Sequence, residues 1–204
     1  MPDLLDSLNP LPHHTALIFD CDGTLADTMP AHFEAWLVIM QRWDLSFSED
    51  QFYAMGGWPT RKIFEMLAAE TGRDLDPDAL AIEKEDEFLK MIDHVQPIQP
   101  VANIVRTHKD QMPIAVGTGA VRSICEMILR QIGLEGAFRT IVASEDVARH
   151  KPEPEVYLEA ARRLEVDPAT CLVYEDTDPG IESAHRAGMD CVDIRQFHTP
   201  RRVT

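Results

Sequence analysis

The sequence predicts an α/β fold in which a parallel sheet carries an inserted α-helical domain. Short aliphatic and β-branched runs, typical of buried parallel strands, are the first indication. The second is the helical spacing of apolar residues between the later runs. The third is the interval between the first two runs, residues 20–113, which far exceeds the roughly dozen residues of one crossover connection. The predicted strands are residues 16–19, 114–116, 140–143, 171–174 and 191–194.

Strands and helices alternate from Pro113 onward. Apolar residues recur with helical spacing between the second and third strands, and again between the third and fourth. After the fourth strand, Asp178 and Pro179 predict the N-cap and the first turn of another helix. This alternation predicts right-handed βαβ units and therefore a parallel sheet. The residues with helical spacing are Ile124, Met127, Ile128 and Ile132, then Tyr157, Ala160, Ala161 and Leu164.

The interval between the first two strands has a helical pattern. Apolar spacing marks helices at residues 33–40, 63–67 and 79–91. The third of these helices carries an acidic stretch, and we expect these side chains to form a solvated face. The acidic residues are Glu83, Glu85, Asp86 and Glu87.

The proline-containing segment 96–100 has the character of a linker that returns the chain to the sheet. We therefore predict a core domain of residues 1–28 and 98–204, and a helical domain of residues 29–97. A helical domain inserted directly after the first strand would act as a lid that excludes water from a site at the strand ends.

Composition and charge narrow the class of protein. The 204 residues are 45% hydrophobic and carry a formal net charge of −16. That length and composition suffice for a sizeable core and for one or two domains. The negative charge argues against nucleic acid or an anionic membrane as a partner. It is compatible with a small anionic substrate, because a metal ion and one lysine reverse the local field.

Targeting and redox signals are not found in the sequence. Residues 1–15 lack the basic and apolar pattern of a signal peptide, and no apolar run is long enough for a membrane span. The cysteines form no C-x-x-C pair, which argues against zinc or a redox motif. We expect a cytoplasmic protein, and a monomer is favoured over an oligomer. The cysteines are Cys21, Cys125, Cys171 and Cys191.

Two carboxylates follow the first strand directly. Asp20 and Asp22 are two residues apart, at a strand end where open α/β sheets bind their ligands. At about 4 Å and an effective dielectric of about 20, their repulsion would cost roughly 4 kcal/mol. A turn needs only one aspartate, so the pair indicates a cation, a shared proton or chemistry.

A Gly-Thr-Gly turn follows the second strand. The hydroxyl of Thr118 and the nearby backbone N–H groups can hold phosphate oxygens, and the flanking Gly117 and Gly119 permit close approach. Arg122 occupies the place of the last glycine in a dinucleotide motif, so the turn is no dinucleotide fingerprint.

Four segments, in order, resemble the motifs of the haloacid dehalogenase (HAD) superfamily of phosphatases and phosphomutases. They are residues 17–28, 116–119, 150–154 and 173–181, which span nearly the whole chain. The resemblance implies an HAD-like Rossmannoid core in which the fourth strand lies beside the first. The insertion resembles a type 1 helical cap, as in the β-phosphoglucomutase-like subfamily and particularly its fructose-1-phosphatase and 6-phosphogluconate phosphatase members.

The resemblance also implies roles for the acidic residues. Asp20 would be the nucleophile that forms an aspartyl-phosphate, and Asp22 the general acid and base. Asp176 would complete a Mg²⁺ site with the side chain of Asp20 and the backbone carbonyl of Asp22. Glu175 would be a further ligand, direct or through water, or would shape the surroundings of the metal.

A lysine completes the implied catalytic set. Lys151 precedes Pro152 and should therefore be extended, just before a helix. There it would bridge the nucleophile and the transferring phosphoryl group and offset charge as it develops. Thr118 would hold phosphoryl oxygens, with Gly119 beside it.

Substrate selection is expected in the helical domain. His32 lies on its first helix, where a histidine of the resembled subfamily faces the sugar; otherwise it is a polar helix residue. A loop at residues 56–62 joins glycines to an aromatic side chain and two cations, which suits contacts to sugar hydroxyls or to a distal anionic group. Trp58 is equally compatible with the core. The substrate-binding candidates in this loop are Trp58, Thr60, Arg61 and Lys62.

The expected function is that of a Mg²⁺-dependent phosphatase of carbohydrate metabolism, which hydrolyses small sugar phosphates such as fructose 1-phosphate or 6-phosphogluconate. One alternative is β-phosphoglucomutase activity, because the motifs are shared and a cation of the helical domain would hold a second phosphate. An alternative of another class is a phospho-accepting receiver domain, which also gathers aspartates, Mg²⁺, threonine and lysine at strand ends. Receivers are about half as long and need no cap.

Overall fold

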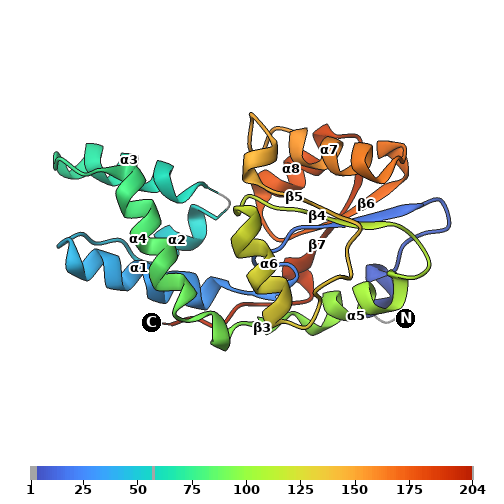
Figure 1. The fold of residues 1–204 in the computed structure, drawn as a ribbon, viewed down its shortest axis with the longest axis horizontal. Coiled ribbons are helices and arrows are strands. Elements are labelled where there is room, and N and C mark those ends of the chain that lie inside the picture. The colour runs from blue at the N-terminus through green and yellow to red at the C-terminus, as the bar shows by residue number, and fades with distance from the viewer. Residues whose placement is uncertain (1–3, 57, 204) are drawn as a thin grey trace. The chain divides into compact units, whose positions relative to one another are not determined.

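The computed structural model describes residues 4–56 and 58–203 and divides them into two compact units (Figure 1). One unit comprises residues 4–27 and 96–199, and the other comprises residues 28–95 and 200–203. The units therefore divide between residues 27 and 28 and between 95 and 96. The final segment, residues 200–203, belongs with the helical unit rather than with the core.

A five-stranded parallel sheet forms the centre of the first unit. Its strand order is β5-β4-β1-β6-β7. The predicted strands are confirmed, with bounds that agree within one residue, and the fourth predicted strand lies beside the first. In the sheet register, Phe19 of β1 lies opposite both Val116 of β4 and Tyr174 of β6. The strands are β1 (Ala16–Phe19), β4 (Ile114–Gly117), β5 (Thr140–Val142), β6 (Cys171–Glu175) and β7 (Asp190–Asp193).

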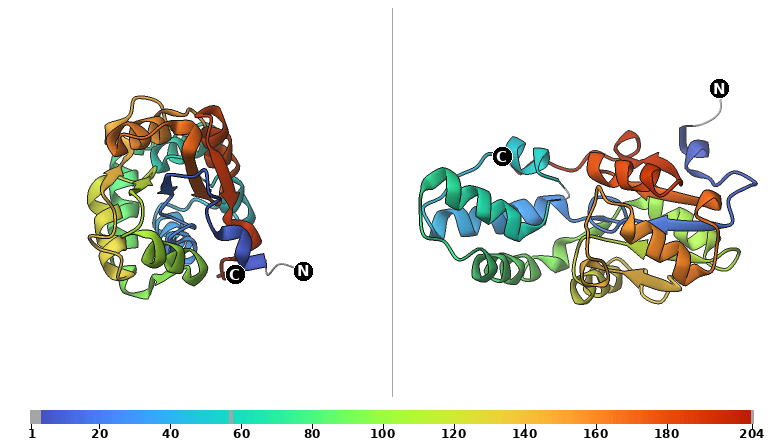
Figure 2. Two further views of the ribbon diagram at one scale, coloured as in Figure 1. Left: turned by 90° about the vertical axis from the view of Figure 1, so that its right-hand side faces the viewer. Right: turned by 90° about the horizontal axis from the view of Figure 1, so that it is seen from above.

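Helices cover both faces of this sheet (Figures 1 and 2). Because side chains alternate along a strand, Ile18 and Val173 point to the face that packs on α7 and α8, where both are fully buried. The opposite face packs on α5 and α6. The helices of this unit are α5 (Gln99–His108), α6 (Arg122–Gln131), α7 (Glu155–Leu164) and α8 (Asp178–Arg186), with short 3-10 helices η1 (Leu4–Leu8), η3 (Ser144–Asp146), η4 (Pro168–Thr170) and η5 (Ile194–Gln196).

The N-cap predicted for α8 was wrong by one residue. Thr177 is extended and its hydroxyl accepts a hydrogen bond from the N–H of Gly180 at 3.1 Å. Asp178 lies in the first helical turn, where its negative charge interacts favourably with the positive end of the helix dipole. Its carboxylate also pairs with Arg195 at 2.7 Å.

A short antiparallel ribbon carries the insertion. β2 (Ala26–Asp27) pairs with β3 (Gln96–Pro97), so the chain leaves and returns through adjacent strands. The predicted linker thus contains β3 and the first turn of α5.

The helical unit has an aromatic core. Phe33 and Trp36 of α1 pack with Phe47, Phe52 and Phe64, all buried. The helix α2 was not expected, although Ser48 and Gln51 form the capping box that could have revealed it. The helices are α1 (Met29–Arg42), α2 (Glu49–Ala54), α3 (Thr60–Thr71) and α4 (Pro77–Leu89), followed by η2 (Ile92–His94).

The expected solvated acidic face of α4 is only partly correct. Asp86 is exposed, but Glu87 is buried and accepts a hydrogen bond from Arg42 at 2.8 Å. Glu83 also pairs with Arg42. Within the same stretch, Lys84 is buried. Packing of α1 against α4, which the acidic pattern did not indicate, removes these groups from water.

The C-terminal segment joins the helical unit through α2. The N–H of Val203 donates to Glu49 Oε1 at 2.8 Å, and its side chain packs on the apolar cluster of this unit. Arg202 pairs with Asp50 at 3.1 Å and lies 4.2 Å from the ring centroid of Tyr53.

Candidate active site

Three strand ends place the predicted catalytic residues at one edge of the sheet. Asp20 follows β1, the central strand, and Thr118 follows β4 on one side of it. Glu175 ends β6 on the other side, and Asp176 follows. Because the three strands are parallel, their carboxyl ends meet at the same edge.

Lys151 links two of these carboxylates. Its Nζ donates to Asp20 Oδ1 and to Glu175 Oε1, each at 2.6 Å, and all three side chains are buried. Burial alone would lower the pKa of Lys151, but the charges of Asp20 and Glu175 outweigh it and hold that pKa well above its usual value. The lysine is therefore a fixed positive charge beside the predicted nucleophile.

Glu175 is fully occupied by protein donors. Its Oε2 accepts hydrogen bonds from the N–H groups of Asp176 and Thr177, both at 2.7 Å, and from the Thr177 hydroxyl at 3.0 Å. Its Oε1 accepts from Lys151 and from the Tyr157 hydroxyl, the latter at 3.2 Å. These bonds favour the role of holding the surrounding groups over that of direct metal ligand.

Helix α8 begins close to this carboxylate. A Cβ atom on Gly180 would lie 1.8 Å from Glu175 Oε1. Only glycine therefore allows the first turn of α8 to pack over Glu175.

Asp176 is held by the loop after β1. The hydroxyl of Thr24, which is buried, donates to Asp176 Oδ1 at 2.9 Å. Gly23 has a φ of 83°, and a Cβ there would lie 2.2 Å from Asp176 Oδ2. Local sequence patterns could not reveal this bond, since the two residues lie 152 positions apart.

Asp22 begins this loop. It forms an isolated backbone bridge with Ala26, and the N–H groups of Leu25 and Ala26 both donate to the carbonyl of Cys21. The tight turn keeps Asp22 next to Asp20 in a half-buried position while the chain leaves for β2.

The electrostatics of the buried carboxylates fit a divalent cation. Burial is the main cause that raises the pKa of Asp20 to about 7, and that of Asp176 well above its usual value, with further contributions from neighbouring carboxylates. Lys151 alone does not balance Asp20, Glu175 and Asp176. Carboxylate oxygens are the ligands that hard cations prefer, so Asp20 and Asp176 could hold such an ion by their side chains.

The turn at Thr118 is arranged for an anion. The Thr118 hydroxyl accepts from the N–H of Ala120 at 3.0 Å, which leaves the hydroxyl proton available as a donor. The N–H of Thr118 donates to Val142 O. Of the three N–H groups in this described turn, only that of exposed Gly119 makes no hydrogen bond.

The helical unit contains the other substrate-binding candidates. Lys62 lies 4.2 Å from the ring centroid of Trp58, which is 39% exposed and therefore not a core residue. Arg61 makes ion pairs of 2.8 Å with Glu65 and Asp78. In addition, the Thr60 hydroxyl donates to Glu85 at 3.0 Å. Gly57, part of the same predicted loop, lies outside the described residues.

A buried cation of this unit was missed by the sequence interpretation. Lys84 Nζ lies 2.6 Å from His32 Nδ1 and 3.1 Å from Glu85 Oε1, and the His32 ring stacks on Phe88 at 3.9 Å. The pattern of charges along α4 does not show that Lys84 is buried while charged residues next to it are exposed to solvent. The contact shows that His32 belongs to a polar group inside the unit.

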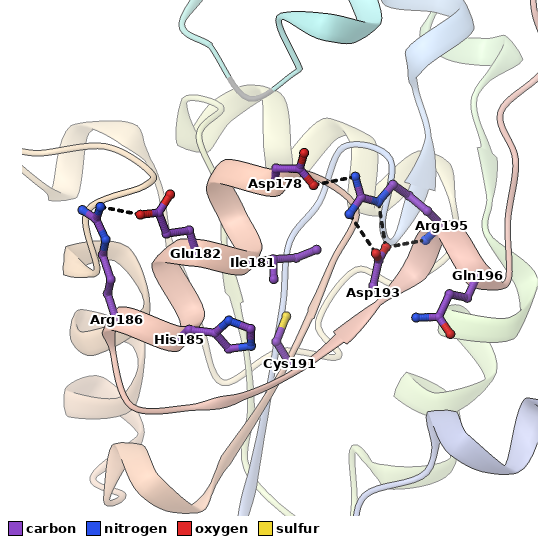
Figure 3. Close-up of a pocket in the computed structure, with 9 residues that line it drawn as sticks. All are labelled: Asp178, Ile181, Glu182, His185, Arg186, Cys191, Asp193, Arg195 and Gln196. Carbon is purple, nitrogen blue, oxygen red and sulfur yellow. Dashed lines mark hydrogen bonds and ion pairs between the residues drawn. The ribbon is translucent and has the colours of Figure 1, made fainter.

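A separate hollow lies along α8 and β7 (Figure 3). Its volume is about 650 Å³. Arg195 pairs there with Asp178 and Asp193, and Arg186 with Glu182, so these cations are already neutralised. Neither arginine of the hollow is therefore free to bind an anion. Its lining consists of Asp178, Ile181, Glu182, His185, Arg186, Cys191, Asp193, Arg195 and Gln196.

A second group of possible metal ligands joins His13, His14 and Asp190. The N–H of Leu11 donates to His14 Nδ1 at 2.9 Å, so the ring proton is on Nε2 and points to Asp190 Oδ2 at 3.0 Å. His14 therefore offers no lone pair to a metal at that nitrogen.

Among the residues described, the helices include none that is both long and apolar enough to cross a membrane.

Similarity to known proteins agrees with this geometry. A family model described as haloacid dehalogenase-like hydrolase matches residues 17–194. The chain is 40% identical over 183 residues to fructose-1-phosphate phosphatase YqaB of Escherichia coli (strain K12), across 89% of this chain and 97% of that protein. It is 30% identical over 188 residues to β-phosphoglucomutase of Bacillus subtilis (strain 168), across 89% and 83%.

A solved structure also shares the fold. The crystal structure of β-phosphoglucomutase from Clostridium difficile matches with a TM-score of 0.77 at 22% identity, over 88% of this chain and 84% of that one. Because the family model matches residues 17–194, the chain belongs to the haloacid dehalogenase-like hydrolase family. The carboxylates at the strand ends, Lys151 and the helical insertion agree with this assignment. Within that family it falls in the β-phosphoglucomutase-like subfamily. The expected enzyme class, a phosphatase of this superfamily, is confirmed, and a receiver domain is not supported.

Proposed function

We propose that this protein is a Mg²⁺-dependent phosphatase of small sugar phosphates, of the fructose 1-phosphate or 6-phosphogluconate type, which acts through phosphorylated Asp20. The observation that carries the proposal is the Lys151 ammonium, 2.6 Å from Asp20 and buried at the meeting point of three strand ends. The 40% identity to a fructose-1-phosphate phosphatase supports that sugar as the first substrate to test.

In the first half-reaction, an oxygen of Asp20 attacks phosphorus and the bond from phosphorus to the sugar oxygen breaks. Asp22 gives its proton to that oxygen, so the sugar leaves as a neutral alcohol. Lys151 offsets the charge that develops on the phosphoryl group. The Thr118 hydroxyl and the Gly119 N–H would hold the phosphoryl oxygens, which the free hydroxyl proton of Thr118 and the exposure of Gly119 support.

In the second half-reaction, water attacks phosphorus and the bond to Asp20 breaks. Asp22, now a carboxylate, takes the proton of the water. Inorganic phosphate leaves, and Asp20 and Asp22 return to their starting states.

The metal site would use the side chains of Asp20 and Asp176 and the backbone carbonyl of Asp22. When bound, Mg²⁺ supplies positive charge that favours attack by one anion on another. Glu175 supports this site indirectly, because it bonds Lys151 and the N–H of Asp176. The Thr24 hydroxyl fixes the orientation of Asp176.

Selection of the sugar is assigned to the helical unit. Lys62 on the exposed Trp58 ring offers a cation and an aromatic face, a combination that suits a polyhydroxylated anion. Arg61 is already paired with two carboxylates, so Lys62 is the better candidate of the two. His32 and its partner Lys84 form a second candidate group.

The test is phosphate release from a panel of sugar phosphates with Mg²⁺, for the wild-type protein and for Asp20→Asn. We expect turnover of fructose 1-phosphate or 6-phosphogluconate that EDTA and the substitution both abolish. Turnover that survives Asp20→Asn would contradict the mechanism.

The resemblance to β-phosphoglucomutase requires one further arm of this test. β-Glucose 1-phosphate is supplied with a trace of glucose 1,6-bisphosphate. Isomerisation without release of phosphate would identify a mutase instead, because a sugar hydroxyl rather than water would then accept the phosphoryl group.

A further inference from the structure

Tyr157 of α7 contacts three parts of the candidate active site. It is fully buried, and its hydroxyl donates to Glu175 Oε1 at 3.2 Å. Lys151 Nζ lies 5.0 Å from the centroid of its ring. The edge of the ring lies against Gly117, where a Cβ would be 3.2 Å from Cδ1 and Cε1. One side chain therefore lies between the end of β4, the lysine and the carboxylate that holds the lysine.

We propose that Tyr157 is a positioning residue for phosphoryl transfer, which acts by directing Lys151 toward Asp20 and the phosphoryl group. This inference rests on the function proposed above. Tyr157 does not itself contact a reacting atom; its effect passes through Glu175 and Lys151.

The hydrogen bonds of Glu175 explain how this works. Oε1 is shared by Lys151 and the Tyr157 hydroxyl, while Oε2 is occupied by donors from Asp176 and Thr177. The phenol bond takes up part of the negative charge on Oε1. Without it, Lys151 would be the sole donor to that oxygen and would be drawn away from Asp20.

The ammonium geometry makes this balance important. A lysine has three N–H donors, and two of those on Lys151 are directed at Asp20 and Glu175. The ammonium also interacts with the Tyr157 phenol, so the orientation of its third N–H donor depends on this side chain. A small shift of Nζ toward Glu175 would misdirect it.

The phenol is a donor under all ordinary conditions. Burial is the main cause that raises the pKa of Tyr157 well above its usual value, and the charge of Glu175 adds to it. The ring also contributes, because its face attracts the ammonium and its edge limits the movement of Gly117, one residue before Thr118.

The test compares Tyr157→Phe with Tyr174→Phe. Tyr174 is an equally buried tyrosine on β6, and its hydroxyl donates to Leu8 O at 2.6 Å, away from the site. We expect Tyr157→Phe to lower kcat for the best sugar phosphate about 10-fold with KM nearly unchanged. Tyr174→Phe should lower the midpoint of thermal unfolding but leave kcat as in the wild type.

A double-mutant cycle distinguishes positioning from a general loss of structure. If Tyr157 acts through Lys151, adding Tyr157→Phe to Lys151→Met should cause no further loss of kcat. A further 10-fold loss in that background would overturn the proposal, as would equal kcat values for Tyr157→Phe and the wild type.

Binding of tungstate, which can accept a fifth oxygen ligand and so mimic the transferring phosphoryl group rather than the bound substrate, provides a measurement that does not need turnover. Calorimetry with Mg²⁺ present should show about 10-fold weaker binding to Tyr157→Phe than to Tyr174→Phe. If the wild type hydrolyses no sugar phosphate, the proposed function fails, but this comparison still decides the role of Tyr157. Equal tungstate affinities would contradict it.

Discussion

The ammonium of Lys151 lies 2.6 Å from Oδ1 of Asp20, although the two residues are 131 positions apart in the sequence. Glu175 holds the same ammonium from the other side at 2.6 Å. Both carboxylates are buried, so neither has water to replace the lysine. A lysine so placed offsets the charge of both carboxylates in the resting site.

Replacement of this lysine should abolish most of the activity. Lys151→Met keeps an unbranched side chain of similar length but removes the charge, and we expect kcat to fall about 10²–10³-fold. Steady-state kinetics would measure the loss. Lys109→Met, at an exposed position after α5, is the matched control and should retain wild-type kcat.

The bond from Thr24 to Asp176 should control the affinity for the metal. Thr24→Val keeps the shape of this buried side chain but removes the donor to Asp176 Oδ1. We expect the Mg²⁺ concentration for half-maximal activity to rise about 10- to 100-fold. Thr24→Ser should restore most of the affinity, since it restores the hydroxyl. An unchanged Mg²⁺ requirement in Thr24→Val would show that the bond does not orient a ligand.

The raised pKa of Asp20, about 7, predicts how pH affects the metal-free protein. The folded state binds this proton more tightly than the unfolded state, whose aspartate has a pKa of about 3.9. The free energy of unfolding should therefore fall as pH rises from about 4 to about 7, and the full stability is present below that window. Asp176 acts in the same direction, because its pKa is also raised.

Urea unfolding in EDTA at about pH 5 and about pH 7.5 would measure this effect. Asp20→Asn removes the titrating group and should reduce the pH dependence. Mg²⁺ should restore stability at the higher pH, because it binds only the folded site. The prediction would be contradicted if the metal-free protein became more stable from about pH 5 to about pH 7.5 and Asp20→Asn showed the same pH dependence of stability as the wild type.

Gly180 should matter for the activity of the site and not for the stability of helix α8. Alanine normally stabilises a helix relative to glycine, but a Cβ here would lie 1.8 Å from Glu175 Oε1 and must displace that carboxylate. We expect Gly180→Ala to lower kcat at least 10-fold, as part of the support of Lys151 is lost.

Gly133→Ala is the control for this substitution. A Cβ at Gly133 meets nothing within 4 Å, but its φ of 70° makes alanine strained. It should cost about 1 kcal/mol of stability and leave kcat unchanged. Equal kcat in the two variants would show that Glu175 can move without consequence.

The C-terminal segment should stabilise the helical unit. A chain that ends at Thr199 lacks the bond from Val203 to Glu49 and the contacts of Arg202 with Asp50 and Tyr53. We expect faster hydrogen exchange in α2 and unchanged exchange in α8, because the segment packs within the helical unit. Mass spectrometry of deuterated peptides would test this, and Arg202→Ala should give a smaller change of the same kind.

Much of the fold could be predicted because its signals are local. The buried strands are short aliphatic runs, and each was located within one residue. The amphipathic helices were also recognisable from their spacing. The short helix α2 was missed, since six residues carry too little periodicity, although the capping box at Ser48 was present. The cap of α8 was assigned to Asp178 instead of Thr177, because both residue types favour that position.

For the candidate site, the sequence likewise indicated some features and not others. Asp20, Asp22, Thr118, Lys151, Glu175 and Asp176 were found from ordered motifs, and the structure brings the strand-end groups and Lys151 to one edge of the sheet. The contacts that support them were not found. Tyr157 was recognised only as one apolar position of a helix. Thr24 and Lys84 bond to residues 152 and 52 positions away, which local patterns do not reveal.

The sequence alone determined the alternation of strands and helices, the position of the insertion and the chemical types that could meet at the strand ends. These follow from local periodicity and from the order of residues along the chain. The three-dimensional packing was needed to show that Glu175 bonds Lys151 and Tyr157, and that Thr24 bonds Asp176. Such pairs join residues far apart in sequence, and their hydrogen bonds depend on distances of a few tenths of an ångström that side-chain packing sets.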